Sequence, residues 1–173
     1  MSTEKIAQIE ETEASESEGE ISEYLTFALA KEEYGVDILR VQEIRGWDSV
    51  TRVPNSPEYV KGVMNLRGAI VPVVDLRVRF GLKHRDFSAT TVVVVLRVMV
   101  VDTEKIIGIV VDGVSGVIEA QTEKISTAPE FGSGIQTEFI HGLVNDGEIM
   151  VMLLDVEKLL AVECISSGIG MEE

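Results

Sequence analysis

Short runs in which apolar and polar residues alternate occupy most of the chain between residues 24 and 154. In residues 24–29 the side chains of Leu25, Phe27 and Leu29 fall on one face, as in a half-buried strand. Residues 34–36 return after a polar turn, which predicts a hairpin. Further strands are predicted at residues 51–53, 62–64, 69–74, 91–101, 105–111, 116–120, 139–144 and 149–154. The pattern predicts a mainly β fold.

Three short helices are predicted between or after these strands, and an aspartate precedes each of them. Asp37, Asp75 and Asp155 can each accept a hydrogen bond from a backbone N–H group that the first helical turn leaves free. The helices are expected at residues 38–45, 76–80 and 156–162.

A turn is predicted at residues 65–68, where Asn comes first and Gly fourth, as is typical of a type I turn. Its tip is expected to present Leu66 and Arg67. An arginine beside an apolar residue on a loop tip suits an interface, because its stem can be buried while its guanidinium donates several hydrogen bonds. A solvated arginine is the alternative interpretation.

The second half of the chain weakly copies the first. Gly62, Asn65 and Asp75 recur 80 residues later, as Gly142, Asn145 and Asp155. The run at 34–36 is echoed at 107–109. A chance match between valine-rich strands is the alternative, but the order of the elements also agrees, which predicts two β-modules.

Candidate catalytic groups are few: two histidines, His84 and His141, and one cysteine, Cys164. The sequence contains no ligand pair with the spacing of a zinc site, no Gly-x-Ser-x-Gly elbow and no phosphate-binding glycine loop. Asp75 and Asp155 are better explained as helix caps than as an acid pair. The sequence therefore predicts no catalytic residues, no metal and no cofactor, and its single cysteine suits a reducing cytosol.

The charge is unevenly distributed. Thirty acidic residues face 15 basic ones, a formal net charge of −15. Residues 1–23 carry −7 and residues 161–173 carry −3, whereas residues 38–85 carry +5 and residues 86–160 carry −8. We expect a disordered acidic tail at 1–22, dispensable for function, and a flexible tail at 163–173. The acidic balance disfavours nucleic acid and anionic lipid as partners.

Three runs, at residues 62–77, 34–44 and 109–114, closely resemble the signature of the CheW family of bacterial chemotaxis coupling proteins. The resemblance implies one domain at 23–162. It would contain two intertwined SH3-like five-stranded β-barrel subdomains, roughly 38–90 and 91–155 with the first strands shared, short helices and a C-terminal helix.

It also implies a non-catalytic adaptor, monomeric alone, that couples transmembrane chemoreceptors to the regulatory domain of the histidine kinase CheA. Such an adaptor is cytoplasmic, is recruited to membrane receptor clusters and does not insert into the membrane; the longest apolar run, residues 92–101, is only about half of a membrane span.

By motif, the receptor-binding residues would be Ile38, Val41, Glu43, Ile44, Asn65 and Arg67. They would form an apolar groove, rimmed by Glu43 and Arg67, for a helical receptor tip. Gly62 matches a position associated with kinase coupling, although a conformational role explains a glycine there equally well. Two alternatives are a CheV-like adaptor that lacks its receiver domain, and a small enzyme that uses the cleft between the barrels and depends on His141 or Asp112.

Overall fold

The computed structural model describes residues 19–83, 86–127 and 137–160. Its strands are β1 (Ile21–Leu29), β2 (Glu32–Asp37), β3 (Val41–Gly46), β4 (Val60–Leu66), β5 (Ala69–Asp75), β6 (Val92–Val100), β7 (Thr103–Val111), β8 (Gly113–Gln121), β9 (Ile140–Asp146) and β10 (Ile149–Leu154). The helical segments are η1 (Ile38–Arg40), α2 (Leu76–Arg79), η2 (Thr122–Lys124), η3 (Thr137–Phe139) and a final helix at residues 156–160. The expected tails fall almost entirely outside the described residues, as does His84.

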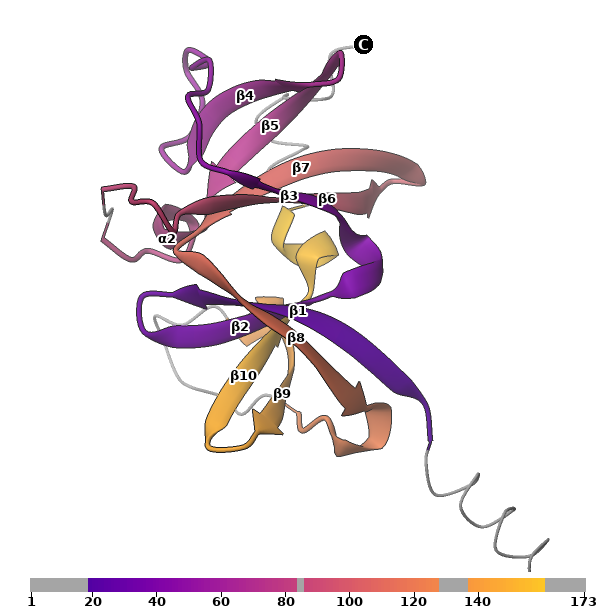
Figure 1. Cartoon of the computed structure of the whole chain (residues 1–173). Helices are drawn as coiled ribbons and strands as arrows, with labels where there is room; N and C mark the ends of the chain where they lie inside the picture. Colours follow the sequence, from indigo (N-terminus) through magenta and orange to yellow (C-terminus); the bar gives the residue numbers. More distant parts are fainter. Residues whose placement is uncertain (1–18, 84–85, 128–136, 161–173) are drawn as a thin grey trace, which may run out of the picture.

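The strands form two five-stranded sheets, which confirms the mainly β prediction (Figure 1). Sheet A has the order β8-β1-β2-β10-β9, and sheet B has the order β3-β6-β7-β5-β4. Most neighbours are antiparallel hairpin partners, but β2 pairs with β10 and β5 pairs with β7 in parallel.

Each sequence repeat contributes strands to both sheets. The first repeat gives β1 and β2 to sheet A and β3, β4 and β5 to sheet B. The second gives β6 and β7 to sheet B and β8, β9 and β10 to sheet A. The glycines of the repeated run hold equivalent places, because Gly35 pairs with Leu153 and Gly108 pairs with Val73. Residues 92–111 therefore belong with sheet B, so the expected division into 38–90 and 91–155 does not follow the sheets.

Each sheet curls until the chain beyond one edge strand meets the other edge strand. In sheet B, Thr51 and Val63 exchange two backbone hydrogen bonds of 2.9 and 2.8 Å. In sheet A, Ser126 and Leu143 do the same, at 2.9 and 2.8 Å. The strand expected at 51–53 is thus reduced to one bridge, and that bridge joins the two edges of its sheet.

Three apolar clusters stabilise this arrangement. One lies within sheet B, around Val71, Val73 and Val95, and one within sheet A, around Val144, Val151 and Leu153. The largest cluster joins the two sheets and includes Leu159 and Leu160 of the final helix, which lies between them (Figure 1). The main hydrophobic core therefore fills the space between the sheets.

The helix predicted at 38–45 is wrong. Asp37 does cap a turn, since its Oδ1 accepts a hydrogen bond of 2.9 Å from the Leu39 backbone N–H, but that turn is the single 3-10 turn η1. Residues 41–46 instead form β3 and pair with β6. Periodicity alone does not distinguish a short strand from a short helix, and pairing with the apolar β6 decides in favour of the strand.

In the described residues, no helix combines the length and the hydrophobicity that a membrane crossing needs.

Candidate partner-binding surface

Glu43 and Arg67 meet although their strands are at opposite edges of sheet B. Glu43 lies on β3, and Arg67 lies in the turn between β4 and β5. The Arg67 Nη1 atom donates a hydrogen bond of 2.5 Å to Glu43 Oε1, and Arg45 Nε lies 3.9 Å from Glu43 Oε2. The curl of the sheet thus joins two of the predicted site residues across its edges.

The turn that carries Arg67 differs from the prediction. Leu66 pairs with Ala69, so the loop has two residues, Arg67 and Gly68, with φ of 51° and 91°. Positive φ at both positions defines a type I′ turn, which matches the twist of a hairpin better than type I. Asn65 supports it by accepting a hydrogen bond of 2.9 Å from Gly68 N–H. Leu66 is buried in sheet B, so Arg67 is presented without it.

Val41 and Ile44, two of the three predicted apolar residues, share one face of sheet B because β3 contains a bulge. Val41 lies opposite Leu96 and Ile44 opposite Val94, whereas Glu43 lies opposite Val95. Leu96 and Val94 belong to the cluster between the sheets. Two residues of β3 thus face one residue of β6, which turns Val41 and Ile44 to the same side. Val41 and Ile44, which the predicted helix would have placed on one face, therefore share a face in the strand as well.

The three apolar residues differ in accessibility. Ile38 and Val41 pack against the cluster between the sheets and are only partly exposed. Ile44 is 43% exposed, and Leu39, which sequence reasoning did not select, is 76% exposed. Ile44 and Leu39 are therefore the exposed apolar residues of this segment, but on β3 the side chain of Ile44 points to the face opposite to that of Glu43, because Glu43 lies opposite Val95 of the cluster within sheet B. Leu39 lies in the single 3-10 turn η1, where the sequence pattern predicted a helix.

Gly62 occupies a place that other residues do not fit. Its φ is 146°, and a Cβ atom there would lie 2.1 Å from the Thr51 carbonyl oxygen. Thr51 is the residue that bridges to Val63 and joins the edges of sheet B. Gly142, its counterpart in sheet A, is crowded in the same way, with a Cβ 2.9 Å from the Ser126 carbonyl oxygen. This geometry assigns Gly62 a conformational role in the candidate surface.

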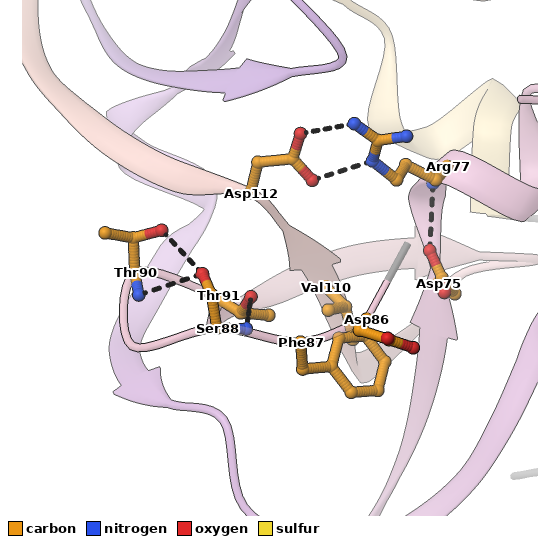
Figure 2. A pocket seen from close by; sticks show the side chains of 9 residues that line it. All are labelled: Asp75, Arg77, Asp86, Phe87, Ser88, Thr90, Thr91, Val110 and Asp112. Atoms are coloured by element: carbon orange, nitrogen blue, oxygen red, sulfur yellow. Dashed lines mark hydrogen bonds and ion pairs between the residues drawn. The ribbon is translucent and has the colours of Figure 1, made fainter. Parts of the chain in front are cut away.

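Two aspartates considered as catalytic candidates, Asp112 and Asp75, make structural contacts. Both carboxylate oxygens of Asp112 bind the Arg77 guanidinium, and Asp75 caps α2 (Figure 2). The cavity beside them, bordered by Phe87 and Thr91, is about 20 Å³, enough for about one water molecule. His141 lies on β9, and in the described ranges no three His, Cys, Asp or Glu side chains are grouped as metal ligands.

The fold and this site define a class: a protein of two curled β-sheets whose candidate site is a surface strip of paired charges and exposed apolar residues. The family model of the CheW-like domain matches residues 23–164. The chain belongs to the CheW family.

Relatives and a solved structure agree over most of the chain. The chemotaxis protein CheW of Klebsiella aerogenes is 51% identical over 141 residues, which are 82% of each chain. The probable chemotaxis protein CheW of Rhizobium etli is 37% identical over 139 residues, 80% of this chain and 87% of its own. The crystal structure of the scaffolding protein TtCheW from Thermoanaerobacter tengcongensis superimposes with a TM-score of 0.72 at 31% identity, covering 82% of this chain and 88% of its own.

Proposed function

We propose that this chain joins chemoreceptors to the histidine kinase CheA, binding a receptor tip on sheet B and the kinase's regulatory domain elsewhere on its surface. As a member of the CheW family, it is a chemotaxis scaffold. In this proposal it is a cytoplasmic, non-catalytic monomer that receptor clusters recruit to the membrane without lipid contact.

The observation that carries the receptor site is the exposed Glu43–Arg67 pair, on the same edge strand as Ile44 and next to the turn that exposes Leu39. Arg67 is 73% exposed on a turn whose backbone holds it at positive φ, so its guanidinium is presented outward while Glu43 orients it. Ile44 and Leu39 offer apolar contacts on the neighbouring strand and turn. An amphipathic helix presents this combination of apolar anchors with flanking charges, and a receptor tip is a helical hairpin.

The decisive variant is Arg67→Ala, tested by titrating the chain with a soluble receptor-tip fragment. We expect a binding loss above about 1 kcal/mol, which is more than about fivefold in Kd. The unfolding midpoint should change little, because an exposed ion pair contributes between about 0 and 1 kcal/mol. Arg52→Ala removes another exposed arginine, on the loop between β3 and β4, and is the matched control. Unchanged affinity of Arg67→Ala would remove Arg67 from the site.

A charge exchange separates direct contact from support. If Arg67 touches the receptor, the double variant Glu43→Arg/Arg67→Glu restores the internal pair without restoring binding. If Arg67 only holds the turn against β3, the double variant recovers affinity. We expect no recovery.

Reconstitution of receptor, kinase and this chain tests the coupling itself. Kinase activity that rises only when the chain is present supports an adaptor. The enzymatic alternative predicts turnover by the isolated chain that is lost in His141→Ala, and the filled space between the sheets speaks against such a cleft.

A further inference from the structure

The chain crosses between the two sheets twice, and an ion pair lies at each crossing. It passes from sheet A to sheet B through η1, where Arg40 pairs with Glu157 of the final helix. It passes back from sheet B to sheet A at Asp112, between β7 and β8, where Asp112 pairs with Arg77 of α2. Each pair therefore fastens a crossing to the short helix that follows the last strand of a sequence repeat, α2 after β5 and the final helix after β10.

The two pairs hold equivalent positions in the two sequence repeats. Arg77 comes two residues after the helix cap Asp75, and Glu157 comes two residues after the helix cap Asp155. Their partners both lie at a crossing, but the charges are reversed, with arginine on the helix in one case and glutamate in the other. The reversal disfavours exchange of partners, because Arg77 would meet Arg40 and Glu157 would meet Asp112.

The pair at the second crossing is rigid. Arg77 Nε and Nη2 donate to the two oxygens of Asp112, both at 2.9 Å (Figure 2). Arg77 Nη1 donates to the Lys83 carbonyl at 3.0 Å. Asp112 Oδ2 also accepts a hydrogen bond of 2.9 Å from Ala30 N–H, in the turn of the sheet A hairpin β1–β2. Only 14% and 21% of the Arg77 and Asp112 side chains are exposed. A planar guanidinium fixed at several points permits little rotation.

The pair at the first crossing is weaker. One nitrogen of Arg40 contacts one oxygen of Glu157, and the side chains are 38% and 32% exposed. Single, exposed ion pairs are easily separated and are screened by salt. One crossing is therefore fixed and the other can be released.

The releasable pair belongs to the segment that carries the candidate receptor site. Arg40 lies between the exposed Leu39 and Val41, and β3 follows directly. Arg97 of β6 also holds this turn, donating a hydrogen bond of 3.1 Å to the Leu39 carbonyl. A partner helix that engages Leu39 and Ile44 therefore acts on the residue beside it, Arg40, and through Glu157 on the helix that packs between the sheets.

We propose that the Arg40–Glu157 pair is a latch that couples occupancy of the η1–β3 face to the packing of the final helix in the core between the two sheets, so that release of the pair shifts the sheets relative to each other about the fixed Arg77–Asp112 pair. The identity of the occupant, a helical receptor tip, rests on the function proposed above. The latch itself is a property of the free chain.

The latch is tested by distance measurement between two spin labels in the full chain carrying Cys164→Ser. Glu58, just before β4 of sheet B and at the end of that strand opposite Arg67, and Met150 on β10 of sheet A are exposed labelling positions. Glu157→Arg places like charges at the latch and should broaden the distance distribution or shift its mean. Lys158→Glu, an equally large charge change at the adjacent exposed position, should reproduce the parent distribution.

Restoration of the pair with opposite sign completes the test. The double variant Arg40→Glu/Glu157→Arg should return the distribution to that of the parent, which a general loss of packing in Glu157→Arg would not allow. A Glu157→Arg distribution identical to the parent overturns the latch, and so does a broadened distribution that the double variant leaves broad.

Addition of a receptor-tip fragment to the labelled parent chain tests the coupling. Binding that shifts the distribution toward that of Glu157→Arg supports it, whereas binding without a shift overturns it. Absence of binding refutes the proposed receptor function and, with it, the coupling. The distance distributions of the free chain and its variants still test the ion pair by itself.

Discussion

Gly62→Ala is expected to open sheet B at the point where its edges meet. The added Cβ would lie 2.1 Å from the Thr51 carbonyl oxygen and 3.1 Å from Arg52 Cα, both backbone atoms that cannot rotate away. The backbone of Gly62 has φ of 146°, a conformation that an alanine rarely adopts. The substitution therefore forces the chain at Thr51 to move and strains residue 62 as well.

The magnitude follows from these two effects. The Thr51–Val63 bridge has two hydrogen bonds, each contributing about 0.5–1.5 kcal/mol net. A non-glycine residue in such a backbone region costs about 1–3 kcal/mol. Together they predict a loss of about 2–6 kcal/mol in the free energy of unfolding. For a chain of this size, in which 1 kcal/mol shifts the midpoint by about 2–4 °C, that corresponds to a midpoint lower by roughly 4–24 °C.

The assay is denaturant and thermal unfolding, with Gly46→Ala as the matched control. Gly46 ends β3 in the same sheet, its backbone lies outside the positive-φ region, and a Cβ there meets nothing within 4 Å. We expect the control to change stability by less than about 0.5 kcal/mol. Equal stability of the two variants would refute the steric reasoning. Loss of kinase activation by a Gly62→Ala chain that is still fully folded would show a direct role for this residue in coupling.

Three other predictions concern pH, a strained turn and the acidic tail. Burial, and secondarily the charge of Glu32, raises the pKa of Tyr34 above its ordinary value of 10.0. The folded state therefore favours the neutral phenol. The stability that this contributes is present below pH 10 and is lost as the pH rises through the folded pKa. Tyr34→Phe should flatten that alkaline decline in the unfolding midpoint, and an unchanged slope would contradict it. Val101 is 81% exposed with φ of 48° in the β6–β7 turn, a conformation costly for a β-branched side chain. Val101→Asn should raise the free energy of unfolding by about 1 kcal/mol. A lower unfolding midpoint would show instead that the valine contributes packing. Deletion of residues 1–18 should leave kinase activation unchanged, and loss of activation in this variant would assign the tail a function. A longer deletion that also removes Glu20 should destabilise β1, because the Glu20 carbonyl accepts a hydrogen bond of 2.8 Å from Thr122 N–H.

Local features of the fold could be predicted because their causes are local. Asp75 and Asp155 accept hydrogen bonds from the backbone N–H groups of Arg77 and Lys158, as the helix-cap pattern predicted. Leu25, Phe27 and Leu29 are buried together, as strict alternation predicted. The resemblance to the CheW family is confirmed by the comparisons. The receptor-binding and kinase-coupling assignments stay predictions.

Errors arose where a long-range partner decided the local structure. Residues 41–46 form a strand because β6 offers them a ladder of hydrogen bonds, and their own sequence does not favour it strongly over a helix. Leu66 was expected at a turn tip, but the type I′ turn moves the loop by one residue and buries Leu66 in sheet B. In both cases the apolar residues were identified correctly, but the geometry that the paired strand imposes on them was not predicted.

By itself, the sequence determined the β-hairpins, the capped turns and the twofold repeat, because alternation, turn residues and caps act over a few residues. Only the tertiary structure decided that the first hairpin of each repeat joins the sheet that holds the second hairpin of the other repeat. The parallel pairings of β2 with β10 and of β5 with β7 that bring these hairpins together join segments far apart in the chain. The same is true of Glu43 with Arg67, Arg77 with Asp112 and Arg40 with Glu157. Such pairs form when sheets curl and cross, and no local periodicity encodes which distant charge will lie within reach.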